Sequence, residues 1–87
     1  MLNFNHKDGR VIPVKERTKS QIYSVLERYI GADVLPQLEY IGNQHISANN
    51  GNIYADFYDH RHTNTDGTPC KTTLYIADYD DYINEII

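Results

Sequence analysis

Cysteine occurs once in this 87-residue sequence, long apolar runs do not occur, and basic residues are scarce after position 28. Cys70 alone can form neither an internal disulfide nor the paired-cysteine knuckle of a zinc site, which fits a reducing compartment. Because apolar runs are only a few residues long, and the chain start does not resemble a signal peptide, no membrane segment is expected. We therefore expect a cytoplasmic protein that has no membrane partner.

The charges are distributed unevenly along the chain. Six of the eight Lys/Arg residues precede position 29, whereas nine of the twelve Asp/Glu residues follow position 28. An acidic surface repels phosphate, so direct binding of nucleic acid is disfavoured for most of the protein. The basic residues before position 29 have no aromatic residues interleaved with their densest cluster, which favours solvated charges over a nucleic-acid site. These residues are Lys7, Arg10, Lys15, Arg17, Lys19 and Arg28.

Motifs for enzyme chemistry are also missing. The chain has no glycine-rich phosphate loop, nucleophile elbow or HExxH pattern, so we predict a protein that is not an enzyme and uses no cofactor. Its length predicts one domain, residues 1–87, with a small core.

The first third predicts a hairpin and a helix. In residues 2–14 a three-residue loop ending at Gly9 pairs Phe4 with Ile12, and a two-residue Asp8-Gly9 loop is the alternative. In residues 17–31 a capping box is followed by an apolar stripe at helical spacing and then by Gly31. The residues of this stripe are Ile22, Val25, Leu26, Tyr29 and Ile30.

Residues 32–42 are ambiguous and favour a loop followed by a short strand that ends at Gly42. After it, Asn50-Gly51 signals a hairpin, and a two-residue loop there pairs Ile46 with Ala55 and His45 with Asp56. Asp66-Gly67 signals a further hairpin, and its two-residue loop pairs Phe57 with Ile76 and Tyr58 with Tyr75. Both registers place Phe57 on an inner face and Tyr54, Tyr58 and Tyr75 on an outer one.

The chain ends with a second apolar stripe in residues 78–87, which predicts a short helix with acidic residues in its first turn. Its members are Tyr79, Tyr82, Ile83, Ile86 and Ile87. The fold class predicted is therefore α+β: a hairpin, a helix, a three-stranded antiparallel meander and a closing helix. Both helices are expected on the apolar face of the sheet, so the outer face has no cover.

The stretch "DFYDHRH" (residues 56–62) raises the possibility of a metal site. Asp56, His60 and His62 share the outer face, and His45 lies across from Asp56 in the predicted register. Asp56 is two strand steps, roughly 13 Å, from His60, so the set does not converge unless the strand bends. Asp59 points inward. Surface histidines are the preferred interpretation, and a metal-dependent hydrolase or nuclease using His60 and His62 is the alternative.

Two further candidates have structural explanations. Cys70 as a nucleophile requires a neighbouring cation such as Lys71 or His62, but it follows Pro69 with inward parity and is expected to be a packed thiol. Asp78, Asp80 and Asp81 as acid or base groups lie where carboxylates cap a helix start.

The outer tyrosines are the strongest candidate for a functional surface. Tyrosine buries a large area while keeping a polar hydroxyl, which is typical of interfaces, although cross-strand pairing also accounts for it. The predicted partner-binding residues are Tyr54, Asp56, Tyr58, Tyr75, Tyr79, Asp80 and Asp81.

The stretches "NIYADFYDH" and "IADYDDYINE" give the last two thirds a composition that resembles small phage and mobile-element inhibitors of host defence, of the anti-CRISPR and anti-restriction type. The likeness is one of composition and no motif accompanies it. It implies an inhibitor, in some cases a DNA mimic, that blocks a basic, nucleic-acid-binding host protein. An antitoxin or immunity protein is the alternative within the same physical class.

Overall fold

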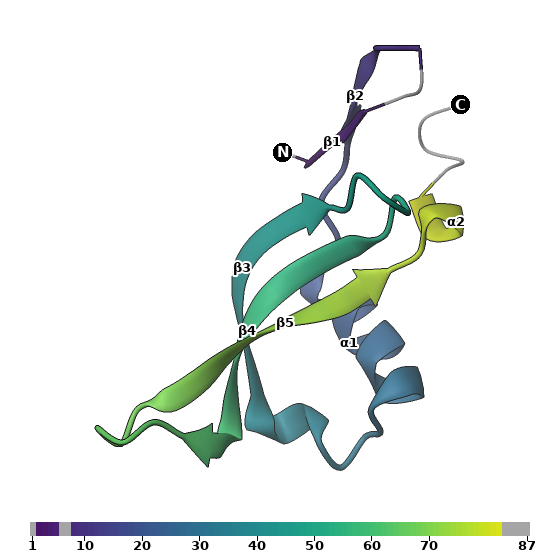
Figure 1. Cartoon of the computed structure of the whole chain (residues 1–87). Helices are drawn as coiled ribbons and strands as arrows, with labels where there is room; N and C mark the ends of the chain where they lie inside the picture. Colours follow the sequence, from purple (N-terminus) through teal and green to yellow (C-terminus); the bar gives the residue numbers. More distant parts are fainter. Residues whose placement is uncertain (1, 6–7, 83–87) are drawn as a thin grey trace.

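The computed structural model describes residues 2–5 and 8–82 and has the predicted α+β architecture (Figure 1). The N-terminal hairpin is a separate two-stranded sheet, and the remaining strands form one antiparallel sheet in the order β3-β4-β5. The elements are β1 (Leu2–Asn5), β2 (Val11–Val14), α1 (Lys19–Tyr29), the 3₁₀ turn η1 (Leu35–Gln37), β3 (Leu38–Ile46), β4 (Ile53–Thr63), β5 (Pro69–Ala77) and α2 (Tyr79–Tyr82).

The N-terminal hairpin has the register of the three-residue loop. Leu2 pairs with Val14 and Phe4 with Ile12, which confirms that prediction over the two-residue alternative. Gly9 has a positive φ of 90°, as a left-handed loop position requires. Leu2 and Val14 are buried, so this hairpin contributes to the core of the whole domain.

Helix α1 begins at the predicted capping box. Thr18 accepts a hydrogen bond from the backbone of Gln21, whose side chain accepts one from the backbone of Thr18. Of the predicted stripe, Ile22, Val25 and Leu26 are buried. Tyr29 is 65% exposed, so its assignment to the core is wrong, because the helix ends there and its ring turns toward the edge of the sheet.

The β3–β4 pairing differs from the predicted register. Ile46 pairs with Ile53, not Ala55, and His45 pairs with Tyr54, not Asp56. The connection is a longer loop, residues 47–52, in which the Gly51 amide donates to the Ser47 carbonyl. Further along, β3 continues through Gly42, where the sequence predicted its end. The register shifts twice there because Gly42 and Asn43 both have positive φ.

The β4–β5 pairing is also shifted from the prediction. Tyr75 pairs with Tyr54 and Phe57 with Thr72, so the predicted pairs Phe57 with Ile76 and Tyr58 with Tyr75 are wrong. The turn closes between Asn64 and Thr68 with Gly67 at positive φ, and a bulge lies between Asp59 and Thr63. The far end of this hairpin extends away from the rest of the molecule, at the lower left of Figure 1.

All of the core lies on one face of the three-stranded sheet. The inner positions of β4, Ile53, Ala55 and Phe57, have no solvent exposure. Side chains from the hairpin, α1 and α2 pack on this face, so the inner face is covered as predicted. The residues that they contribute are Leu2, Val14, Ile22, Leu26 and Tyr82.

The second helix is described only for its first turn. Tyr82 is fully buried and its hydroxyl donates a short hydrogen bond to the Gly51 carbonyl, which ties α2 to the 47–52 loop. Ile83, Ile86 and Ile87 of the predicted stripe lie outside the described residues. Within the described part of the chain, no helix is long and apolar enough to cross a bilayer.

Candidate interaction surface

The outer face of the sheet is the side opposite the core. Its positions follow from the alternation of β4, in which Tyr54 and Tyr58 are partly exposed between fully buried neighbours. Strand β5 adds Lys71, Thr73 and Tyr75 to the same face through its pairing with β4. Among residues 2–5 and 8–82, α1 and the N-terminal hairpin pack on the inner side and leave this face open (Figure 1).

Four rings form a continuous row across the outer face and onto the helix. His45 of β3 stacks on Tyr54 of β4, with ring centroids 6.0 Å apart and an interplanar angle of 23°. Tyr54 meets Tyr75 of β5 edge to face at 6.2 Å, and Tyr75 meets Tyr29 of α1 at 5.2 Å. These spacings are those of favourable aromatic pairs. We call these four residues the ring row.

An exposed carboxylate, Asp78, lies beside the ring row at Tyr75. Burial raises the pKa of Tyr75, and hydrogen bonding to Asp78 and Tyr29 raises it further, so the phenol stays neutral. Asp78 follows β5 directly, and Asp80 and Asp81 lie in α2; all three are exposed. The Asp81 carboxylate accepts a hydrogen bond of 2.7 Å from the Asp78 amide, which is a structural role of the kind expected at a helix start.

Asp56 has the predicted position on the outer face but is only 6% exposed. Its carboxylate accepts hydrogen bonds from the Asn43 amide group at 3.0 Å and the Thr73 hydroxyl at 2.8 Å, and Lys71 lies 3.6 Å away. These hydrogen bonds, followed by the charge of Lys71, hold the pKa of Asp56 below its usual value. Its charge is compensated within the sheet, so it stabilises β3–β4–β5 and presents little charge to a partner.

Tyr58 lies on the outer face but apart from the ring row. It is opposite Glu39 on one side and Lys71 on the other, and lines a hollow of about 520 Å³ with the far end of the β4–β5 hairpin. The Glu39 carboxylate is 3.0 Å from His60 Nε2. The Glu39 and Lys71 side chains beside Tyr58 therefore also have partners within the protein.

Tyr79 does not join the outer tyrosines. Its ring packs on Phe4, with centroids 5.4 Å apart, and on Tyr82 at 5.5 Å. It therefore contributes to the junction of the N-terminal hairpin with α2. The sequence grouped it with the outer tyrosines, but the chain changes direction between β5 and α2.

The candidate metal ligands do not converge. Across residues 2–5 and 8–82 no three His, Cys, Asp or Glu side chains gather into a metal-binding group. His45 Nδ1 is 2.9 Å from the Asn43 carbonyl, His60 meets Glu39, and His62 is exposed on the extended hairpin. The geometry therefore favours surface histidines. The Cys70 thiol is half-buried and donates to the Asn64 side-chain oxygen at 3.3 Å.

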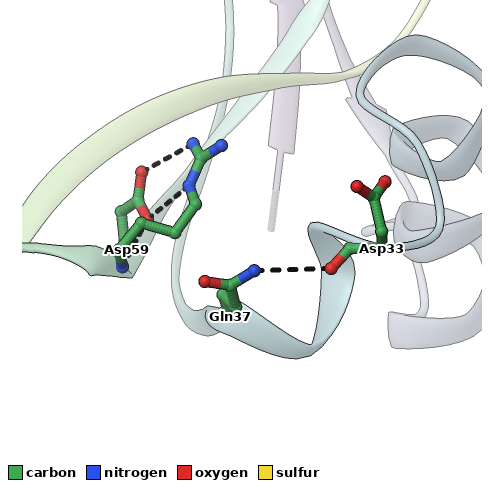
Figure 2. A network of polar contacts seen from close by, with 4 residues as sticks. Asp33, Gln37 and Asp59 are labelled. Atoms are coloured by element: carbon green, nitrogen blue, oxygen red, sulfur yellow. Dashed lines mark hydrogen bonds and ion pairs between the residues drawn. The ribbon is translucent and has the colours of Figure 1, made fainter.

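An ion pair between the buried Asp59 and the exposed Arg61 holds the base of the extended hairpin. Asp59 is 6% exposed and accepts hydrogen bonds from Arg61 Nη2 at 2.8 Å and from Nε and the backbone amide at 3.0 Å each. Figure 2 shows this pair close to Asp33 and Gln37 at η1, where Gln37 donates to the Asp33 carbonyl. Hydrogen bonds from Arg61 lower the pKa of Asp59 to about 2. Asp59 is inward as predicted, but its partner Arg61 was not predicted.

This pair makes stability depend on pH in the acid range. Because the folded pKa of Asp59 is about 2, below the unfolded value of about 3.9, its contribution is complete above pH 4 and is lost as pH falls toward 2. We expect Asp59→Asn to lower the urea midpoint at pH 6 and to match the wild type near pH 2. Urea titrations of both proteins at several pH values measure this difference. A difference that stays constant from pH 2 to 6 contradicts the prediction.

Two residues at the outer face of the sheet, Tyr29 and Asn43, have positions that the sequence did not predict. Tyr29 was assigned to the core by its helical spacing, although its place in the last turn of α1 was visible. Asn43 was given no role, although the pair Gly42-Asn43 joins the two residue types that most readily adopt positive φ. That pair was the available signal for the bulge that brings the Asn43 amide to Asp56.

Comparisons with known proteins returned no matching family model, no matching curated protein and no matching solved structure.

Proposed function

We propose that this chain is a non-enzymatic binding protein that engages a basic partner through the ring row and the carboxylates of Asp78, Asp80 and Asp81. The observation that carries the proposal is the ring row: four aromatic rings from three strands and a helix, on a face that no other part of the described chain covers. Rigid aromatic side chains of this kind are enriched at protein interfaces. A row that spans the sheet gives a partner contact area at low cost in side-chain entropy.

The charge pattern supports a basic partner. Asp56 is paired with Lys71, and the Glu39 carboxylate is hydrogen-bonded to His60, so these two carboxylates are already engaged within the protein. The exposed Asp78 carboxylate lies next to Tyr75 of the row, and the exposed Asp80 and Asp81 follow it in α2. Arginine and lysine side chains stack on tyrosine rings and pair with carboxylates, so a basic surface satisfies both parts of this site.

The compositional resemblance to phage and mobile-element inhibitors supports a specific kind of partner, a basic host protein whose nucleic-acid channel is blocked. Strains that each carry one CRISPR effector, one restriction enzyme or one nucleic-acid-cleaving toxin are suitable test hosts. We expect expression of this chain to restore phage plating, or growth in the toxin strains, for one of these proteins. Failure to inhibit or bind any member of the panel in purified form would overturn the proposed class.

The acidic end of the surface is tested by Asp80→Lys. We expect this charge reversal to weaken binding to the inhibited protein about tenfold, mainly through slower association, because rim charges steer encounter. Association and dissociation rates at low and high salt, measured by surface plasmon resonance, separate this effect from a loss of fold.

Asp66→Lys is the matched control, since it makes the same charge change at the exposed tip of the β4–β5 hairpin. Equal weakening by both variants would show that only net charge matters and would contradict a role for the α2 carboxylates. Asp56, also a predicted partner-binding residue, is unsuited to charge reversal because a lysine at this buried position would disrupt the sheet.

A further inference from the structure

A second surface feature lies away from the outer face, between α1 and the end of β5. It is a cleft of about 290 Å³ lined by Ser20, Ser24 and Arg28 of α1 and by Arg17, which precedes the N-cap Thr18. In a helix of 3.6 residues per turn, residues separated by four and eight positions lie along one stripe, as Ser20, Ser24 and Arg28 do. This stripe runs beside the buried one, so the fold that packs α1 on the sheet also turns these polar groups toward the cleft.

The other walls differ in chemistry. Ile76 and Ala77, both buried residues at the end of β5, line the apolar side together with Val25. Asp81 of α2 is the one carboxylate in the lining. Apolar walls restrict water and so strengthen the attraction between charges inside the cleft. Among the described residues, the lining therefore contains two arginines and one carboxylate.

The helix wall is rich in hydrogen-bond donors. Arg17 is buried, with its backbone amide donating to Gln44 and its Nη2 to the Lys15 carbonyl, which holds the side chain in place along the wall. Arg28 is exposed at its rim. The hydroxyls of Ser20 and Ser24 lie one helical turn apart and add two more donors. Guanidinium groups and hydroxyls together are the groups that bind phosphate oxygens.

We propose that this cleft binds a phosphate group, either as inorganic phosphate or as a small phosphomonoester. A phosphate has three terminal oxygens and up to two negative charges, so it uses donors that converge from several side chains better than a planar carboxylate does. The volume lies at the lower limit of known ligand sites, which start at about 300 Å³. The cleft therefore holds the phosphate with a small organic group against Ile76 and Ala77. The cleft shares Asp81 with the proposed partner surface, but the phosphate proposal does not rest on that function.

The test is a titration of the ¹⁵N-labelled full chain with sodium phosphate, O-phosphoserine and adenosine 5′-monophosphate, followed by two-dimensional NMR at constant ionic strength. We expect saturable shifts at the amides of Ser20, Ser24, Arg28 and Ala77, which sodium chloride and sodium acetate do not produce. The ligand with the highest affinity identifies the source of the phosphate. Shifts that do not saturate, or that spread over all basic residues, overturn the proposal.

Two variants make the test specific. Arg28→Gln is expected to weaken the binding of phosphate about tenfold, the effect of losing one charged hydrogen bond. Lys19→Gln makes the same charge change on the opposite side of α1, because nine residues of helix place Lys19 and Arg28 half a turn apart around the helix axis. This variant is expected to leave the binding of phosphate unchanged. Equal effects of the two variants overturn the site, because they would indicate attraction to net charge alone.

A third variant reverses the sign of the effect. Asp81→Asn removes the carboxylate that opposes the ligand. We therefore expect this variant to bind phosphate more tightly than the wild type does. The asparagine side-chain oxygen still accepts the hydrogen bond from the Asp78 amide, which preserves the first turn of α2. Weaker binding by this variant would contradict the placement of the phosphate beside Asp81.

Discussion

Phe57→Ala is expected to lower the free energy of unfolding by about 3–5 kcal/mol, the cost of truncating a buried phenylalanine. Phe57 has no solvent exposure and its ring lies 5.6 Å from that of Tyr40. It occupies the centre of β4, the middle strand, so β3 and β5 both lose contacts with it. Domains of this size are stable by only about 5–15 kcal/mol, so this variant is expected to be partly unfolded at 37 °C.

Urea denaturation followed by circular dichroism measures this loss, and Tyr29→Ala is the matched control. It removes a ring of similar size from a position that is 65% exposed, in a helix where alanine is favoured. We expect it to cost less than about 1 kcal/mol. If the two variants are destabilised equally, the core is not confined to the inner face, and the assignment of the outer face as a free surface fails with it.

The faces of the sheet were predicted correctly although both of its registers were wrong. At the β4–β5 turn the pairing of residues is offset by one position from the predicted register. The bulge between Asp59 and Thr63 increases this offset by three more positions. The sum is even, so Phe57 stays inward and Tyr54 and Tyr75 stay outward. A turn motif alone does not reveal a bulge elsewhere in the strand, whereas the burial pattern constrains parity strongly.

The Asn50-Gly51 hairpin was misassigned because tertiary contacts override its local turn preference. The Gly51 carbonyl accepts the hydrogen bond from the buried Tyr82 hydroxyl, and a side chain at this position would meet the ring of Tyr79 at 3.0 Å. Gly51 is therefore needed for close packing against α2. The 47–52 loop adopts a longer form that places it there, and the sequence contains no local signal of that contact.

The interaction surface was predicted in part for similar reasons. The alternation of β4 and β5 was sufficient to place Tyr54 and Tyr75 on one face. The position of Tyr29 depends on how α1 crosses the edge of the sheet, and the burial of Asp56 depends on the Asn43 bulge. Both are consequences of three-dimensional packing, so the composition of the chain overstated the acidity of the outer face.

The ring row makes a strong prediction about the proposed interface. Tyr54→Ala is expected to weaken binding to the inhibited protein by about 30-fold or more, because Tyr54 contacts both His45 and Tyr75 and its loss interrupts the row at its centre. The effect should appear mainly as faster dissociation, since removal of a central aromatic side chain does not alter charge steering. Surface plasmon resonance measures both rates.

Tyr58→Ala is the matched variant for this experiment, because it makes the same truncation on the same strand and face, four residues away and outside the ring row. If the row is the main contact, Tyr58→Ala weakens binding less than about threefold, well below the threshold of a binding hot spot. Equal losses would assign the interface to the whole tyrosine face, and a larger loss from Tyr58→Ala would move it to the hollow beside Glu39 and Lys71. Unchanged binding by both variants would exclude the outer face altogether, which leaves the α2 carboxylates as the remaining contact.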